Sequence, residues 1–353
     1  MTIKILLFSA GLLLLVKGAD YFVKAAASLA KKLGVSELVI GLTLVSLGTS
    51  VPELASSIVA AFKGQTSLVV GMVIGANVAN MLLITGIAAV FVAIGTKREM
   101  IERDGFIMLA TTALFCLFAW NGAFSRLEAA VMLLVYVAYT LFLFTAKAGL
   151  EEQYGFRQFL NYLFRFQYIL TIKDSVRAGL SRRKTAKAMA VAEKKIARAF
   201  QEGIVKDLLV MLAGGTAIAF GADLFIGAAV YFAEILKVPS VVVGASVVSF
   251  GTTLPEMSVT VSAARKGYGN IALGNVIGSC ITNAGLIIGV SGLIRPLGAA
   301  RAGLPLLLSF LLFACLLLLV LIRSAWRIRR WEGAILLVFY ATYAALLYIN
   351  WIF

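Results

Sequence analysis

Two similar six-residue segments place a glutamate directly after a proline inside long apolar stretches. Residues 48–53 read GTSVPE, and residues 251–256 read GTTLPE. A proline inside a helix removes one backbone hydrogen bond and clashes with the carbonyl group four residues earlier. Backbone groups freed in apolar surroundings need other polar partners. Both segments are therefore expected to line a polar cavity, with Glu53 and Glu256 as its acids.

Other oxygen-bearing side chains accompany the two glutamates. Hydroxyl groups come from the same segments and amide groups from the apolar stretches that follow them: Thr49, Ser50, Thr252, Thr253, Asn80 and Asn283. Oxygen ligands without sulfur or imidazole suit hard cations such as Ca²⁺, Na⁺ or Mg²⁺. Two carboxylates brought together carry two negative charges, which match one divalent cation. No lysine or arginine lies near either motif in these stretches, so a structural ion pair is not expected.

The composition is that of an integral membrane protein. Of the 353 residues, 61% are hydrophobic and 14% are charged, whereas a soluble domain is about half apolar. Continuous Leu, Val and Ala runs of roughly 20 residues indicate spanning helices and not the alternating strands of a membrane barrel. We expect an all-α polytopic protein with ten spans, at residues 3–27, 36–62, 67–94, 105–121, 127–147, 204–234, 238–264, 269–293, 303–322 and 332–351. Ionisable residues inside a membrane are functional by default, which again points to Glu53 and Glu256.

The two halves of the sequence are similar to each other. A shift of 203 residues aligns GLTLVSLGTSVPE (41–53) with GASVVSFGTTLPE (244–256), and GMVIGANVAN (71–80) with GNVIGSCITN (274–283). Of the 46 positions from 41 to 86, 19 are identical to their partners. This similarity indicates an internal duplication.

Five predicted spans precede a basic segment and five follow it. Because five is odd, the second copy enters the membrane from the opposite side, as in many secondary transporters. The sequence therefore predicts two inverted five-helix repeats, at 1–147 and 204–353, joined by a basic linker at 148–203. Asp20 and Asp223, in the first helix of each repeat, are expected to have structural roles.

The positive charge follows the predicted loops. Lysine and arginine gather in the connections that lie on one side, including the whole linker 148–203, while the other side holds few. By the positive-inside rule both termini are expected outside, in a prokaryotic cell membrane. The linker contains basic residues among Phe, Leu, Tyr and Ile, so part of it is expected to form an amphipathic helix on anionic lipid of the inner leaflet. The net charge of +15 is thus a topology signal, and no nucleic-acid partner is expected.

Several function classes are excluded by what the sequence lacks. It contains no histidine, and Cys116, Cys280 and Cys315 form no CxxC or CxxH pair, so soft metal binding is not expected. No nucleotide-binding loop is present, so transport would be driven by an ion gradient. No nucleophile has a base nearby other than the glutamates, so we expect neither an enzyme nor a cofactor.

The paired motifs resemble the two alpha repeats of the calcium/cation antiporter superfamily, specifically the sodium/calcium exchanger type. The resemblance rests on GTSVPE, GTTLPE, GMVIGANVAN and GNVIGSCITN and covers nearly the whole chain. It implies alternating access, with Ca²⁺ and Na⁺ competing for one cluster of sites between the halves. It places Ca²⁺ between Glu53 and Glu256, with the carbonyl groups of Thr49 and Thr252.

The resemblance also implies sodium sites on either side of the calcium site. One would use Ser249, Thr253, Ser279 and Glu256, and the other Ser46, Ser50, Glu53 and a hydroxyl group at position 76. Position 76 is alanine, whereas its repeat partner is Ser279, so one sodium site lacks a side-chain ligand. Asn80 and Asn283 are both amides, and potassium-dependent exchangers carry an aspartate at the latter position, so potassium co-transport is not expected.

Two alternatives keep the carboxylate pair. A proton/calcium exchanger of the same fold would use Glu53 and Glu256 as proton carriers, although that branch typically shows GNxxE-like motifs. A more remote alternative is a cation channel, which needs a continuous pore. Inverted repeats favour alternating access over a channel.

Overall fold

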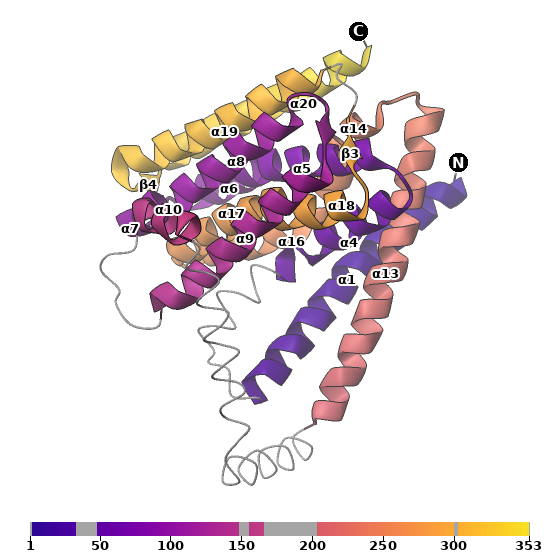
Figure 1. The fold of residues 1–353 in the computed structure, drawn as a ribbon, viewed down its shortest axis with the longest axis horizontal. Helices are drawn as coiled ribbons and strands as arrows, with labels where there is room; N and C mark the ends of the chain where they lie inside the picture. The colour runs from indigo at the N-terminus through magenta and orange to yellow at the C-terminus, as the bar shows by residue number, and fades with distance from the viewer. Residues whose placement is uncertain (1, 33–47, 148–154, 166–202, 300–302, 353) are drawn as a thin grey trace.

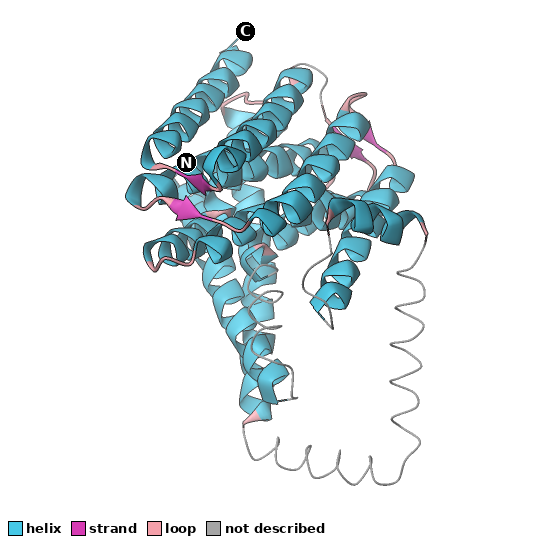
Figure 2. Cartoon of the chain, turned by 90° about the vertical axis from the view of Figure 1, so that its left-hand side faces the viewer, coloured by secondary structure: helices cyan, strands magenta, loops and turns pink. Residues whose placement is uncertain are grey.

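The computed structural model describes residues 2–32, 48–147, 155–165, 203–299 and 303–352. Over these ranges the chain is helical apart from turns and four two-residue strands (Figures 1 and 2). The elements up to residue 165 are α1 (Thr2–Lys32), α4 (Val51–Phe62), α5 (Thr66–Val78), η2 (Ala79–Ile84), α6 (Thr85–Phe91), β1 (Ile94–Gly95), α7 (Arg98–Met100), η3 (Ile101–Gly105), α8 (Phe106–Ala119), β2 (Ala123–Phe124), α9 (Arg126–Lys147) and α10 (Phe156–Phe164). The elements after residue 203 are α13 (Ile204–Ile235), α14 (Ser240–Val243), η4 (Gly244–Val248), α15 (Ser249–Thr252), α16 (Leu254–Arg265), α17 (Gly269–Thr282), η5 (Asn283–Ile287), α18 (Ile288–Ile294), β3 (Leu297–Gly298), α19 (Leu304–Ala325), β4 (Arg327–Ile328) and α20 (Arg330–Ile352).

Among the described residues, fewer helices can cross a membrane than the ten predicted. Within the described residues, six helices are long and apolar enough, or seven if the bent pair 240–252 and 254–265 is one span. The predicted spans 36–62, 105–121 and 332–351 are not among them. The first is described only from residue 48, where α4 has 12 residues, and α8 has 14 residues. Helix α4 falls short of the roughly 20 residues that a span needs. Helix α8 continues α7 and η3 without a break, and this stretch contains Glu102, Arg103 and Asp104. The predicted total is therefore not confirmed.

Helices α1 and α13 pack against each other and extend beyond the other helices (Figures 1 and 2). Their contact runs through glycines at equivalent repeat positions, Gly11 and Gly18 in α1 and Gly214 and Gly221 in α13. A Cβ atom at Gly18 would lie 3.0 Å from the carbonyl oxygen of Gly214, and one at Gly221 would lie 2.8 Å from that of Gly11. Small residues let helix backbones approach closely in membranes. The first helices of the two halves therefore form one antiparallel unit.

The other helices of each half pack on the opposite half in a reciprocal pattern. Helix α20 packs against α6 and η2, while α9 packs against α18 and η5, which hold the equivalent places in the second half. The short strands are exchanged in the same way. Strand β1 pairs antiparallel with β4, and β2 pairs antiparallel with β3. Each half thus completes the packing of the other.

The two segments that carry the asparagines lie at the centre of the molecule. The apolar window within 66–91 is 94% buried and that within 269–294 is 72% buried, against 22% for the window within α1. Helix α5 meets the 240–248 segment backbone to backbone, because a Cβ atom at Gly75 would overlap the carbonyl oxygen of Ala245. Polar side chains in such an enclosed place must find partners in the protein or in a bound ion.

Equivalent aspartates in α1 and α13 make different ion pairs. Asp20 pairs with Lys24 of its own helix at 2.8 Å. Asp223 pairs with Lys63 at 2.8 Å, and the Lys63 ammonium also donates to the Asp223 carbonyl oxygen at 3.2 Å. Each aspartate therefore forms an ion pair, and the pair of Asp223 with Lys63 joins the two halves.

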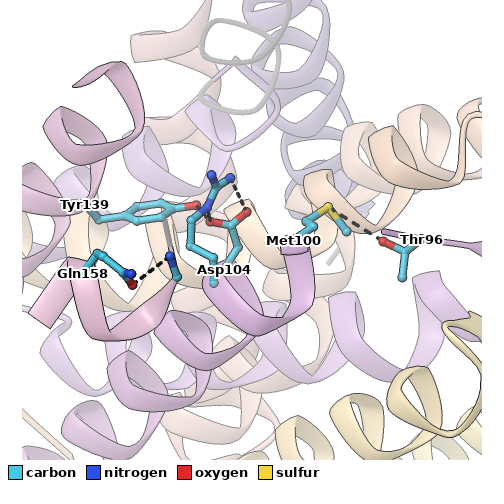
Figure 3. A network of polar contacts seen from close by, with 7 residues as sticks. Thr96, Met100, Asp104, Tyr139 and Gln158 are labelled. Carbon is cyan, nitrogen blue, oxygen red and sulfur yellow. Dashed lines mark hydrogen bonds and ion pairs between the residues drawn. The ribbon is translucent and has the colours of Figure 1, made fainter. Parts of the chain in front are cut away.

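Helix α10 is the described part of the basic linker. The Gln158 side chain accepts a hydrogen bond from the backbone N–H of Gly155 at 3.0 Å and so caps the helix (Figure 3). The buried Phe159 ring packs 6.3 Å from the ring of Tyr139 and 5.6 Å from that of Phe142. The apolar face of α10 is therefore turned to α9. Residues 148–154 and 166–202 lie outside the described residues, so the lipid contact of the linker stays a prediction.

One buried acid near α10 is fully paired. Figure 3 shows Asp104 beside Tyr139. Arg103 donates to both oxygens of Asp104, at 2.9 and 3.0 Å, and the Tyr139 hydroxyl donates at 3.4 Å. This is the usual state of a buried carboxylate, since an unpaired one is costly.

Candidate cation-binding site

Each proline motif breaks its helix at the residue that precedes the proline by two. Ser50 has φ −87° and ψ 5°, and Thr253 has φ −82° and ψ 4°, whereas α-helical residues have ψ near −42°. In the second half the axis bends by 50° at this point. Helices α4 and α16 start immediately afterwards, so Glu53 and Glu256 lie in their first turns. Negative charge is favoured there by the helix dipole.

The two glutamates are buried without a basic partner. Glu53 is 2% exposed and Glu256 is 1% exposed. None of the ion pairs between described residues includes either of them. Both carboxylate oxygens of Glu53 and Oε2 of Glu256 have no hydrogen-bond partner within the described chain. Ser50, in the same motif as Glu53, donates a hydrogen bond to Glu256, so the two motifs meet and bring two carboxylates with free oxygens that can hold a cation.

A wider helical turn presents an asparagine in each half. Asn80 lies in the π-helical turn η2 and Asn283 begins the equivalent turn η5. Single π-helical turns are frequent at functional sites. Asn80 is fully buried and neither polar atom of its side chain has a partner among the described residues, and the same holds for Oδ1 of Asn283. Nδ2 of Asn283 donates to Oδ1 of Asn77 at 3.0 Å.

Hydroxyl groups of the first motif reach the glutamate of the second. Ser50 donates to Oε1 of Glu256 at 3.2 Å and contacts the Ser279 hydroxyl at 3.3 Å. Thr49 also lies beside Glu256. In the opposite direction, Thr252 lies beside Glu53. The structure therefore brings together the residues predicted for the calcium site, although Ser50 contacts Glu256 and not the Glu53 side for which it was predicted.

Other predicted ligands turn their hydroxyl groups to their own helices. Ser249 donates to the carbonyl oxygen of Ser246 at 3.0 Å, and Thr253 donates to that of Ser249 at 2.9 Å. Thr252 donates to the carbonyl groups of Val248 and Ser249, both at 3.2 Å. Each of these oxygens can still accept or coordinate through its lone pairs. Ser46 lies outside the described residues.

Position 76, where a sodium-binding hydroxyl group was expected from the family resemblance, is a buried alanine. Ala76 is 1% exposed and lies in α5 next to Gly75, against which the Ser249 hydroxyl packs. Its repeat partner Ser279 contacts Ser50. The two sides of the site are therefore chemically unequal.

Several polar residues at the site were missed by the sequence analysis. Asn275 accepts a hydrogen bond from Thr49 at 3.4 Å, and Nδ2 of Asn77 donates to the Cys280 carbonyl oxygen at 3.3 Å. Ser56 and Ser57 are fully buried in α4 with hydroxyl groups that have no partner among the described residues. The repeat alignment could have indicated Asn275, because it aligns this amide with a methionine at the equivalent position 72.

The family described as "Sodium/calcium exchanger protein" matches this chain over residues 3–145 and 206–349. The sodium/calcium exchanger MaX1 of Methanosarcina acetivorans is 44% identical over 347 residues, which cover 98% of this chain and 99% of the relative. The putative antiporter CaxA of Alkalimonas amylolytica is 30% identical over 345 residues, covering 96% of both.

Solved structures of a sodium-calcium exchanger also match this chain over nearly its whole length. The sodium-calcium exchanger NCX_Mj, soaked with 2.5 mM Na⁺ and 10 mM Sr²⁺, matches with a TM-score of 0.60 and 26% identity over 98% of both chains. The same protein soaked with 100 mM Na⁺ and 10 mM Sr²⁺ also matches with a TM-score of 0.60. These matches, together with the apolar helices, identify a helical membrane protein with the architecture of a cation exchanger. The family match extends over both halves of the chain, and this protein therefore belongs to the sodium/calcium exchanger family.

Proposed function

We propose that this protein is a secondary antiporter that exchanges Ca²⁺ for Na⁺ by alternating access. One observation carries the proposal: two carboxylates from different halves are buried among oxygen-bearing side chains, and neither has a lysine or arginine partner among the described residues. Such a pair is stable when a cation neutralises it. The names of the relatives MaX1 and NCX_Mj point to the same ions.

In this proposal Ca²⁺ binds between Glu53 and Glu256, with oxygen atoms of Thr49 and Thr252. The side-chain oxygens of Asn80 and Asn283, which have no partner among the described residues, would be neutral supports. Sodium ions use flanking positions that share the glutamates. The remaining sodium or supporting ligands are Ser46, Ser50, Ser249, Thr253 and Ser279. The hydrogen bonds of Ser50 with Glu256 and Ser279 support a place for it on the Glu256 side.

The proposal includes ten spans arranged as two inverted five-helix repeats, at 1–147 and 204–353, with the linker at 148–203. The reciprocal packing of α9 and α20 and the exchanged strand pairs support this arrangement. Inverted repeats give two conformations in which a central site faces opposite sides. In the present conformation Lys63 is tied to Asp223, whereas its repeat partner Lys266 has no ion pair among the described residues. The two ends of the molecule thus differ, as alternating access requires.

A topological prediction follows from the duplication. Lys63 and Lys266 follow α4 and α16 at equivalent positions, so inverted halves place them on opposite sides of the membrane. Each is replaced by cysteine in a background without Cys116, Cys280 and Cys315, and intact cells are treated with an impermeant thiol reagent. Position 63 should label from outside, and position 266 only after permeabilisation. Labelling of both positions from the same side would exclude the inverted repeat.

Adding the missing hydroxyl group should strengthen sodium coupling. Ala76→Ser makes α5 equivalent to α17 at position 279, and one additional ligand should lower the Na⁺ concentration for half-maximal exchange about threefold. The measurement is Na⁺-dependent Ca²⁺ efflux from proteoliposomes at several Na⁺ concentrations. Ala119→Ser, a buried change in α8 away from the site, is the control. An unchanged Na⁺ dependence in Ala76→Ser would mean that position 76 is not near a sodium ion.

Mutual competition between the two ions tests the proposed function on purified protein. Ca²⁺ binding is titrated at increasing NaCl, with choline chloride at equal ionic strength as the control. A single shared site predicts that the apparent Kd for Ca²⁺ rises with Na⁺ and not with choline. If lowering the pH displaces Ca²⁺ while Na⁺ does not, the proton/calcium exchanger is the better account.

A further inference from the structure

Asn275 is a buried amide whose contacts all lie at the candidate site. It lies in α17 and is 5% exposed. Its Oδ1 accepts a hydrogen bond from the Thr49 hydroxyl at 3.4 Å. Its Nδ2 donates to the Thr260 hydroxyl at 3.1 Å and to the Glu256 carbonyl oxygen at 3.5 Å. One side chain therefore connects the first motif, α16 and α17.

These contacts distinguish Asn275 from Asn80, the asparagine of the turn η2. Both polar atoms of Asn80 lack a partner within the described chain, so its Oδ1 is open to a cation. The oxygen and the nitrogen of Asn275 are both engaged by protein groups. An amide whose oxygen and nitrogen are both hydrogen-bonded to protein groups can orient those groups but is not free to bind the ion itself.

The repeat provides an internal comparison, because position 72 is equivalent to 275 and carries methionine. Methionine has no N–H group and only a weak acceptor. Met72 is 1% exposed, so an apolar side chain fills the equivalent buried place in the first half.

The absence of an amide at position 72 is visible at the equivalent contacts. Thr252, the partner of Thr49, donates its hydroxyl to carbonyl groups of its own helix at 3.2 Å. Ser57, the partner of Thr260, is fully buried and its hydroxyl has no partner among the described residues. Asn275 therefore hydrogen-bonds to Thr49 and Thr260, whereas no asparagine at position 72 hydrogen-bonds to their repeat partners Thr252 and Ser57.

We propose that Asn275 is a positioning residue that fixes Thr49 and the backbone of Glu256, so that the Glu256 side of the site is preorganised for Ca²⁺ and the Glu53 side is not. The inference rests on the proposed function, since it assigns a role at the proposed calcium site. Residues that orient metal ligands typically change metal affinity about tenfold or more when they are replaced. Preorganisation raises affinity because less ordering remains to be done on binding.

The test compares KM for Ca²⁺ with the maximal exchange rate in proteoliposomes. Asn275→Met copies the first half and should raise KM about tenfold, with the maximal rate changed by less than about threefold. Met72→Asn places an amide on the Glu53 side and should lower KM about threefold. Met72→Leu is the matched control, because it keeps an apolar side chain of similar size. The double variant Met72→Asn/Asn275→Met should recover part of the lost affinity.

The outcomes separate the two claims. If the unmodified protein moves no Ca²⁺, the proposed function and this inference fall together. If it moves Ca²⁺ and Asn275→Met keeps the original KM, the inference alone is overturned. A purely structural role would lower the yield of folded protein and the maximal rate, with KM unchanged in the remainder. If Asn275→Met does not fold, Met72→Asn decides, and an unchanged KM in that variant overturns the inference.

Discussion

Glu53→Gln and Glu256→Gln should each reduce Ca²⁺ transport about a hundredfold or more, because one carboxylate cannot neutralise a divalent ion at a buried site. Both side chains are almost fully buried, so water cannot replace the lost charge. Glutamine keeps the size of the side chain and removes only its charge. The effect should therefore appear in transport and not in the amount of folded protein. The measurement is uptake of radioactive Ca²⁺ into vesicles loaded with Na⁺.

Glu332→Gln is the matched control for this experiment. Glu332 is also 2% exposed, but it accepts a hydrogen bond from the backbone N–H of Arg329 at 2.7 Å and so caps α20. Its glutamine variant should transport Ca²⁺ at close to the original rate. Substantial uptake by either Glu53→Gln or Glu256→Gln would contradict a site that needs both carboxylates.

Gly71→Ala should destabilise the protein strongly, whereas Gly274→Ala should be tolerated. The two glycines are repeat partners but differ in their surroundings. A Cβ atom at Gly71 would overlap the backbone carbonyl group of Val241, while at Gly274 the nearest atom is Sδ of Met100 at 3.8 Å. Overpacking in a core typically costs about 1–3 kcal/mol, and backbone atoms cannot move aside as a side chain can. We expect Gly71→Ala to lose at least that much.

Thermal unfolding of the detergent-purified variants measures this difference. Gly71→Ala should unfold well below the unmodified protein or elute as an aggregate, and Gly274→Ala should unfold within a few degrees of it. Equal behaviour of the two variants would mean that α5 and α14 do not approach each other as closely as described.

The central features of the site could be predicted from the sequence because they are local and repeated. The proline directly before each glutamate predicts a helix break there, and the structure has one at Ser50 and one at Thr253. The duplication predicts that the two motifs meet between the halves, and Ser50 of the first motif does contact Glu256 of the second. Residue type alone indicated oxygen ligands for a hard cation.

Other features depend on packing between distant segments and left no local signal. The side of the site on which Ser50 lies follows from how the halves cross, which a repeat alignment does not fix. Asn275 is a polar residue in an apolar helix, and its partners Thr49 and Thr260 become neighbours only after folding. The number of spans was predicted from hydropathy, which does not reveal the break at Ser50 that leaves α4 with 12 residues.

The coupling of Ca²⁺ movement to Na⁺ is the central claim, and flux under imposed gradients tests it most directly. Purified protein is reconstituted into vesicles, and Ca²⁺ uptake is followed with an outward Na⁺ gradient, an outward H⁺ gradient, or neither. The membrane potential is clamped so that only the chemical gradient differs. We expect uptake against the Ca²⁺ gradient with the Na⁺ gradient alone, and its loss in Glu53→Gln and Glu256→Gln. Uptake driven by the H⁺ gradient and indifferent to Na⁺ would contradict sodium/calcium exchange.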